Sequence, residues 1–185
     1  MSKTFIDLIQ DQFQFGGVKY ASKNAGKEAT DELVEDFGWN WLIGTQAKYV
    51  KRYRNQVLEK DLLKIGCYQY INFLKRGYHL SPLGTAEMLC TTVATKTAHF
   101  PKFVEKLQCY DLGTTLGRGI IFTREDYLNR IYTLLLDLRT NVSENHFLEI
   151  CALCSEIWEL DGWDKQEEHK TDTWNKGASS NGKKN

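Results

Sequence analysis

The sequence has no long uninterrupted apolar run and no net charge. No apolar stretch in the 185 residues approaches the roughly 20 residues that a membrane-spanning helix needs. The N-terminal segment mixes charges into its apolar positions, whereas a secretory signal has a continuous apolar core. We therefore expect a cytoplasmic protein without a membrane partner. Because 24 basic residues balance 24 acidic ones, any affinity for an anion must come from a local cluster.

The cysteines do not form an even, regularly spaced set. An odd number of cysteines in mostly apolar surroundings favours buried, reduced thiols over a disulfide framework. Cys151 and Cys154 share a predicted helix with His146, but no second cysteine pair completes a zinc site, so core packing is the favoured interpretation. The five cysteines are Cys67, Cys90, Cys109, Cys151 and Cys154.

A helical periodicity is present between residues 39 and 78. Apolar and aromatic side chains recur there at spacings of three and four on both sides of a short polar turn, which is typical of an antiparallel helical hairpin. With 42% hydrophobic and 12% aromatic residues, the chain can build a real core. We predict a mainly α fold, with helical hairpins packed in a single compact bundle over residues 1–163.

Capping residues mark the other predicted helices. Thr123, with Asp126 at the third position, begins a helix over 124–139, and Ser143 begins another to about 160, which makes a second hairpin over 124–161. Glycines interrupt residues 109–122 and predict an ordered loop or a short β-hairpin. The remaining predictions are a helix over 1–14, a loop over 15–28, a helix from 28 to Gly38, a helix over 82–97 after Ser81-Pro82, a restart at Pro101 and a disordered tail over 164–185.

Residues 54–78 and 139–163 resemble each other at a constant offset of 85. Duplication of a hairpin explains the match, and so do two unrelated amphipathic helices. The second segment is not basic, so we expect any chemistry to lie in the first. Six of the 25 positions are identical, namely Arg54/Arg139, Val57/Val142, Glu59/Glu144, Leu63/Leu148, Ile65/Ile150 and Gly77/Gly162.

Acidic residues gather between Glu28 and Asp36, where five carboxylates occur without a basic residue. Carboxylates three or four positions apart share one helical face, which can hold a hard divalent ion such as magnesium through oxygen ligands. A solvated acidic face near a helix start explains the same pattern. The candidate Mg²⁺ ligands are Asp31, Glu32, Glu35 and, from a later helix, Asp61.

Basic residues gather between residues 48 and 64, where six of them outnumber two acidic residues. Lysine and arginine on one helical face suit phosphate groups or a nucleic-acid backbone. A solvated face that balances the neighbouring acids is the alternative. Tyrosines nearby could stack on a base, although tyrosines at helical spacing more often belong to the core and its rim. The candidate phosphate-binding residues are Lys48, Lys51, Arg52 and Lys64.

The glycine-rich segment Gly113–Gly119 offers backbone N–H groups and Arg118, as an anion nest would. It lacks the Gly-Lys-Ser/Thr ending of a Walker loop, so a structural turn is favoured. No serine or cysteine is placed as an obvious nucleophile, and no catalytic residue is predicted.

Two short motifs resemble known phage families. The first motif resembles a family of small helical phage proteins that includes nucleotide kinases without a Walker loop. It consists of Gly44-Thr45, Lys48-Tyr49 and Arg52, followed by Leu58-Glu59-Lys60-Asp61-Leu62, Lys64 and Tyr68. Phe15-Gly16-Gly17, with Lys19-Tyr20, resembles the entry motif of the phage dATP/dGTP diphosphohydrolase N-terminal family, which is linked to MazG-type pyrophosphohydrolases. The resemblance covers roughly residues 15–78 and implies a role in phage nucleotide metabolism.

The MazG-type motif requires an acid pair, a further Glu three residues on, and a downstream Glu-x-x-Asp that together hold Mg²⁺. Asp31, Glu32 and Glu35 fit the first part. Glu59 and Asp61 are one residue too close, so their side chains point about 200° apart on a helix.

The sequence therefore favours a protein that binds, and in an enzyme version processes, (deoxy)nucleoside phosphates with Mg²⁺. The alternative is a non-enzymatic phage accessory or anti-defence protein that binds nucleic acid or a protein partner through its basic hairpin. Self-association into a homo-oligomer, with tryptophans such as Trp39, Trp41, Trp158 and Trp163 at the contacts, is a third expectation.

Overall fold

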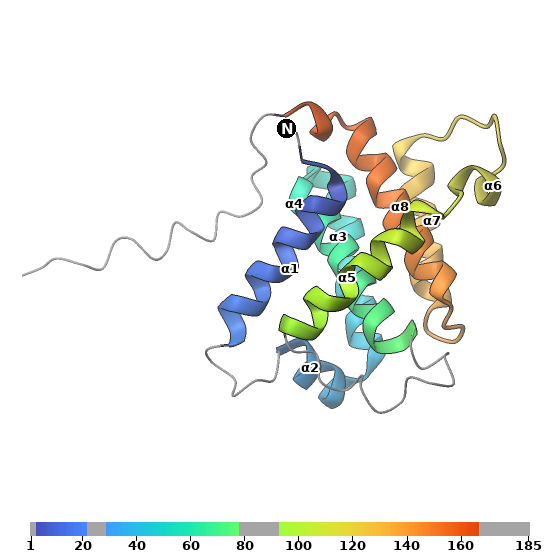
Figure 1. The fold of residues 1–185 in the computed structure, drawn as a ribbon. Coiled ribbons are helices and arrows are strands. Elements are labelled where there is room, and N and C mark those ends of the chain that lie inside the picture. Colours follow the sequence, from blue (N-terminus) through green and yellow to red (C-terminus); the bar gives the residue numbers. More distant parts are fainter. Residues whose placement is uncertain (1–2, 22–28, 78–92, 167–185) are drawn as a thin grey trace, which may run out of the picture.

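The computed structural model describes residues 3–21, 29–77 and 93–166, and the regular elements in these ranges are all helices (Figure 1). The predicted mainly α fold is confirmed. The elements are α1 (Phe5–Ala21), α2 (Ala29–Phe37), α3 (Trp39–Gln56), α4 (Glu59–Asn72), the π-helix η1 (Phe73–Gly77), α5 (Val93–Gln108), α6 (Leu112–Leu116), α7 (Arg124–Asp137), α8 (Glu144–Leu160) and the 3₁₀-helix η3 (Trp163–Lys165).

Two helical hairpins form the centre of the fold. α3 packs on α4 and α7, and α8 packs on the same two helices, so the four helices form a ring. The neighbours across the hairpins are antiparallel, because Glu59 at the start of α4 meets Trp158 near the end of α8, and Arg54 near the end of α3 meets Asn129 near the start of α7. This arrangement is that of an antiparallel four-helix bundle.

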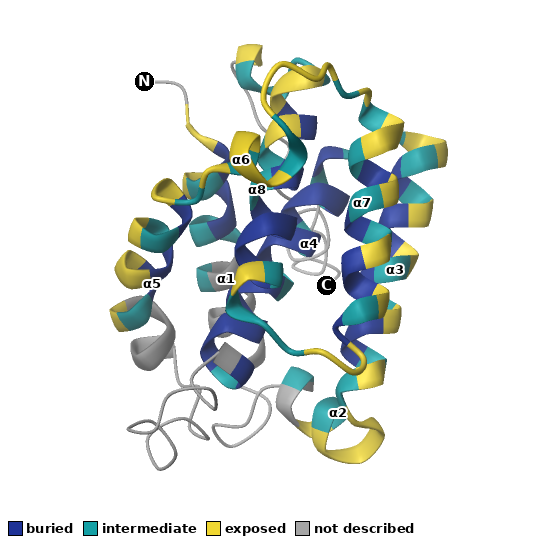
Figure 2. Cartoon of the chain, turned by 90° about the vertical axis from the view of Figure 1, so that its right-hand side faces the viewer, coloured by how far each residue is buried: buried dark blue, intermediate teal, exposed yellow. Residues whose placement is uncertain are grey.

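α4 is the central helix of the molecule. In Figure 2, α1 and α5 lie on one side of the α4–α8 layer and α3 and α7 lie on the other. α4 is therefore buried along most of its length, polar residues included. α1 approaches it closely at Gly66, where a Cβ atom would lie 2.6 Å from Cδ1 of Ile9. The absence of a side chain at this position lets the two helices touch.

The predicted helix starts of the second hairpin are confirmed. The Thr123 side chain accepts a hydrogen bond from the backbone N–H of Asp126, and the Asp126 side chain accepts one from Thr123, which completes a capping box. Ser143 lies at the N-cap position of α8. α2 ends at Phe37, and Gly38 follows with a φ of 72°, a conformation that glycine adopts readily.

The loop predicted over 15–28 is wrong for its first half, because α1 continues to Ala21 through Gly16 and Gly17. Each glycine costs a helix about 1 kcal/mol relative to alanine. Packing of the buried face of α1, which includes Leu8 and Ile9, against α4 outweighs this cost. Residues 22–28 lie outside the described residues.

The helix break predicted at Pro101 is also wrong, because α5 runs through it from Val93 to Gln108. Proline removes one intrahelical hydrogen bond and often kinks a helix. Here Pro101 is exposed, whereas Phe100 and Phe103 on either side of it are buried in the core. Their packing holds both halves of the helix in place. The helix predicted over 82–97 lies mostly outside the described residues.

The segment 109–122 forms the short helix α6 and irregular backbone, not a β-hairpin. The side chain of Asp111 caps α6 by accepting a hydrogen bond of 3.0 Å from the N–H of Thr114. This local bond stabilises a helical turn in a segment whose composition indicated a loop or strands. The disordered tail predicted over 164–185 begins too early, because η3 includes Asp164 and Lys165. Residues 167–185 lie outside the described residues.

Candidate functional site

Three cationic side chains surround the ring of Tyr49. Nζ of Lys48, Cζ of Arg52 and Nζ of Lys64 lie 5.0, 5.1 and 5.3 Å from the ring centroid. Lys48 and Arg52 share a face of α3 at a spacing of four, and Lys64 faces them from α4. The ring is 8% exposed and attracts each cation through its electron-rich faces. We call these four residues the Tyr49 cluster.

The carboxylate of Asp61 contacts this cluster through Arg52. Arg52 holds it with two hydrogen bonds, one from Nε to Oδ2 at 2.6 Å and one from NH2 to Oδ1. The Asp61 side chain is fully buried, whereas that of Arg52 is 34% exposed. The hydrogen bond to Asp61 raises the pKa of Arg52 above its usual value. Arg52 is therefore fixed from the inside while part of it still faces solvent.

Tyr68 extends the aromatic surface beside the cluster. Its ring stacks on Tyr49, with centroids 6.2 Å apart and planes 20° apart. Lys51, the fourth predicted phosphate-binding residue, lies elsewhere, because its Nζ is over the ring of Tyr132 on α7 at 5.6 Å. The structure thus brings together Lys48, Arg52 and Lys64 and directs Lys51 toward the second hairpin.

The predicted magnesium ligands are not gathered in the same way. Glu32 and Glu35 are exposed on α2, which packs against α3 and precedes its first residue (Figure 2). Asp61 instead pairs with Arg52, about 20 Å along α3 from that first residue. The side chain of Asp31 is outside the described part. Among the described residues, no group of three or more His, Cys, Asp or Glu is arranged to hold a metal ion.

A polar network closes one end of the bundle. The hydroxyl of Tyr53 donates to Oδ2 of Asp161 at 2.5 Å and accepts from Nε1 of Trp163 at 3.1 Å. Arg124 binds the other oxygen of Asp161 at 3.1 Å. Burial, reinforced by Asp161, raises the pKa of Tyr53 well above its usual value, so this hydroxyl stays protonated. The network ties η3 to the first hairpin.

Tryptophans that we expected at subunit contacts lie against polar groups of the same chain. Trp158 is buried, and its Nε1 donates to Oε1 of Glu59 at 2.8 Å. Trp163 contacts Tyr53, and Trp39 lies 4.9 Å from the Arg76 guanidinium. Sequence reasoning missed these pairs, since each joins segments far apart in the chain.

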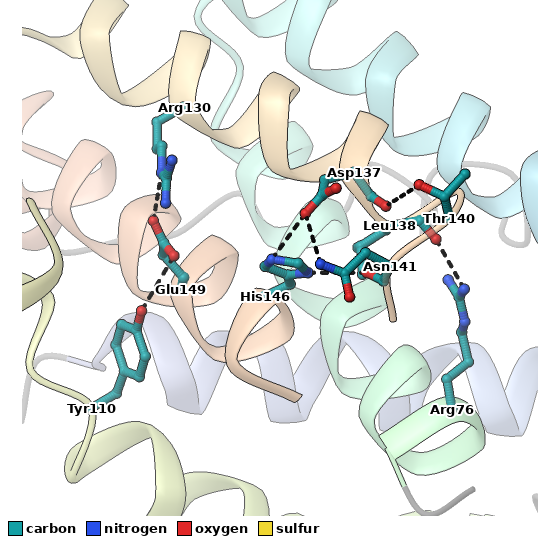
Figure 3. Close-up of polar contacts among 9 residues, drawn as sticks. All are labelled: Arg76, Tyr110, Arg130, Asp137, Leu138, Thr140, Asn141, His146 and Glu149. Carbon is teal, nitrogen blue, oxygen red and sulfur yellow. Dashed lines mark hydrogen bonds and ion pairs between the residues drawn. The ribbon is translucent and has the colours of Figure 1, made fainter. Parts of the chain in front are cut away.

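A second polar cluster lies on the other hairpin (Figure 3). Buried Glu149 accepts hydrogen bonds from Arg130 at 2.6 Å and from the hydroxyl of Tyr110 at 3.3 Å. Next to it, Asp137 lies 3.2 Å from Nε2 of His146. These contacts join α7, α8 and the segment before α6, so they are structural ties.

The cation of the glycine-rich segment is paired with a neighbouring carboxylate. Arg118 binds Oδ2 of Asp111 at 2.9 Å. Hydrogen bonds from Thr114, and then from Arg118, lower the pKa of Asp111 to about 2. The interpretation of residues 113–119 as a structural turn agrees with this geometry.

The cysteines of α8 are core residues. Cys151 and Cys154 are fully buried free thiols, and burial raises the pKa of Cys151 to about 12. The usual value is 9.0, so the unfolded chain releases this proton first as the pH rises. The stabilising contribution is complete below pH 9 and is lost progressively as the pH rises toward 12.

Cys151→Ala should therefore remove part of the alkaline destabilisation. Between pH 8 and 10.5 we expect the parent protein to lose about 2 kcal/mol more unfolding free energy than Cys151→Ala. Urea unfolding at the two pH values measures this difference. Cys109→Ala, at an exposed position, is the control and should retain the parent's pH dependence. Equal losses in the parent and Cys151→Ala would contradict the prediction.

None of the described helices has the length and apolarity required to cross a lipid bilayer. No family model matches the chain, and neither a curated protein nor a solved structure matches it.

Proposed function

We propose that the Tyr49 cluster binds the phosphate groups of a nucleotide. The observation that carries the proposal is the convergence of Lys48, Arg52 and Lys64 within 5.3 Å of one ring, with Asp61 as the facing carboxylate. A guanidinium and two ammonium groups provide the charge-assisted donors that phosphate oxygens require. The resemblance of residues 15–78 to phage nucleotide-metabolism proteins favours the same ligand class.

A compact ligand suits the site better than an extended strand. A nucleic-acid backbone requires cations spread along a face, because successive phosphates are several ångströms apart. Here three cations gather around one ring, and Lys51 lies over Tyr132 instead. The phosphate chain of a single nucleotide matches that compact geometry, and the partly exposed ring of Tyr68 offers a neighbouring surface for a base.

In this proposed function, Mg²⁺ is bound to the phosphate groups of the nucleotide and not to a site on the protein. Mg²⁺ commonly bridges phosphate oxygens and keeps several of its waters. The four predicted protein ligands do not fit a single site, because Asp61 is held by Arg52 and the acids of α2 lie at the other end of α3. This arrangement supports nucleotide binding as the function, with no step that depends on a protein-bound metal.

Charge reversal at Lys48 tests the proposal. Lys48 is exposed, so Lys48→Glu should keep the fold while it weakens binding of deoxynucleoside triphosphates by about tenfold or more. Titration calorimetry with dATP, dGTP and tripolyphosphate, with and without Mg²⁺, measures the affinity. A thermal-shift series with the same ligands provides a second readout.

Arg139→Glu is the matched control, since it makes the same charge change at an exposed position outside the cluster. It should reduce affinity by less than twofold to threefold at 0.15 M salt, where long-range charge effects are screened. Equal affinity of the Lys48→Glu and Arg139→Glu proteins would refute the proposal. Tight binding of a single-stranded oligonucleotide, with no binding of mononucleotides, would favour nucleic-acid binding as the function instead.

A further inference from the structure

The offset of 85 residues, found from residue identities between 54–78 and 139–163, also relates the helix boundaries. α3 begins at Trp39 and α7 at Arg124, while α4 begins at Glu59 and α8 at Glu144. Both pairs of starts differ by 85. The starts of α3 and α7 lie outside the matched segments, so they test the offset independently.

Burial follows the same offset. The four buried residues of α7 each fall on a buried residue of α3. The equivalent pairs are Ile43/Leu128, Gln46/Ile131, Tyr49/Leu134 and Val50/Leu135. The same helical face is therefore turned inward in both hairpins.

Contacts between the hairpins are reciprocal. At the offset of 85, position 53 is equivalent to position 138 and position 161 is equivalent to position 76. If a rotation of 180° exchanges the hairpins, a contact between positions 53 and 161 must therefore recur between positions 138 and 76. Tyr53 does bind Asp161, and NH2 of Arg76 donates to the carbonyl oxygen of Leu138 at 3.0 Å (Figure 3). The antiparallel pairing of α3 with α7 and of α4 with α8 places this axis perpendicular to the helices.

An acid and a base are paired at equivalent positions in both hairpins, with their order along the chain exchanged. Arg52 binds Asp61 in the first hairpin, and Asp137 binds His146 at the same two positions of the second. In each pair the first-helix residue is the more exposed, with 34% for Arg52 and 44% for Asp137. The outward group is thus a cation in one copy and an anion in the other.

The two hairpins also differ at residues next to these pairs and at residues in the interior of the bundle. Lys64 of the Tyr49 cluster is equivalent to buried Glu149. Three buried polar residues of the first hairpin are matched by apolar or thiol side chains in the second. These pairs are Gln46/Ile131, Gln69/Cys154 and Asn72/Ile157.

We infer that the bundle is an internal duplication of one helical hairpin about a pseudo-two-fold axis. We infer also that the exchange of acid and base between the equivalent pairs restricts anion binding to the first copy. The second part rests on the proposed function of the Tyr49 cluster. One nucleotide should bind per chain, because the outward residue of the second pair is the carboxylate of Asp137, and the position of Lys64 is taken by Glu149, which Arg130 holds in the interior.

Exchange of the two acid–base pairs tests the inference. R52D should lower the melting temperature by about 10 °C, because it places a second carboxylate against buried Asp61. R52D/D61H installs the pair of the second hairpin and should recover more than half of that loss. H146D should lower the melting temperature by about 3 °C, and D137R/H146D should return it to the parent value.

T133R/H146D is the control, since Thr133 is exposed one helical turn before Asp137 and is not equivalent to Arg52. It should leave the loss caused by H146D in place. If D137R/H146D is no more stable than T133R/H146D, or R52D/D61H no more stable than R52D, the two pairs are not equivalent and the duplication is refuted.

Binding of tripolyphosphate and dATP to the same proteins tests the polarity. R52D/D61H should lose affinity by tenfold or more while D137R/H146D stays within about twofold of the parent. Equal affinity in both exchanged proteins would overturn the assignment to the first copy. Failure of the parent to bind either ligand would refute the proposed function alone, because the melting-temperature comparison does not depend on a ligand.

Discussion

Arg52→Ala is expected to destabilise the fold by about 3–5 kcal/mol, although Arg52 is partly exposed. The reason is that its partner Asp61 is completely buried, so removal of the guanidinium leaves an uncompensated carboxylate inside the protein. Asp61→Ala should cost less, about 1–2 kcal/mol, because the Arg52 side chain is 34% exposed and can turn toward water. Urea unfolding followed by circular dichroism measures both values.

The double replacement R52A/D61A is the control for this asymmetry. It removes the buried charge together with its partner, so it should be more stable than Arg52→Ala alone. A cost below 1 kcal/mol for Arg52→Ala would mean that the pair behaves as an ordinary surface ion pair. The predicted order of stability is parent, then Asp61→Ala and R52A/D61A, then Arg52→Ala.

Trp158→Phe is expected to cost about 2–3 kcal/mol, the second large effect. The replacement keeps an aromatic ring but removes the N–H that donates to Glu59 across the bundle at 2.8 Å. Glu59 is only 5% exposed, so a hydrogen bond to a carboxylate in a poorly solvated position is lost. Chemical unfolding of the purified variant gives the difference.

Glu59→Gln supplies the comparison that isolates this hydrogen bond. The amide oxygen of glutamine can still accept from Nε1 of Trp158, so Glu59→Gln alone should be mild. In that background Trp158→Phe should cost at least 1 kcal/mol less than in the parent, because the hydrogen bond that is lost no longer has a charged acceptor. The same cost in both backgrounds would show that Trp158 acts only through packing.

The hairpins could be predicted because their signals are local. Apolar spacing identified α3 and α4, and the capping box at Thr123 identified α7, since each signal acts within a few residues. The exceptions are positions where distant packing outweighs local preference. α1 runs past Gly16 and Gly17 because α4 supports it, and α5 passes Pro101 because Phe100 and Phe103 anchor it.

The candidate site was only partly accessible from the sequence. Lys48, Arg52 and Lys64 lie in one hairpin, so their clustering follows from helix geometry. The sequence showed Asp61 as an acid at a helix start but could not show that Arg52 holds it. Pairs such as Tyr53 with Asp161 and Glu59 with Trp158 are 108 and 99 residues apart, and no local pattern encodes such contacts.

The separation of these contacts along the chain also bears on how the bundle assembles. Contacts within each hairpin join neighbouring helices and can form early, whereas the contacts that dock one hairpin on the other join residues 62 to 108 positions apart. Docking should therefore be the slow step of folding. The entropy cost of closing a loop grows with its length, by about 0.6 kcal/mol for each doubling, so docking one hairpin on the other costs more entropy than closing either hairpin.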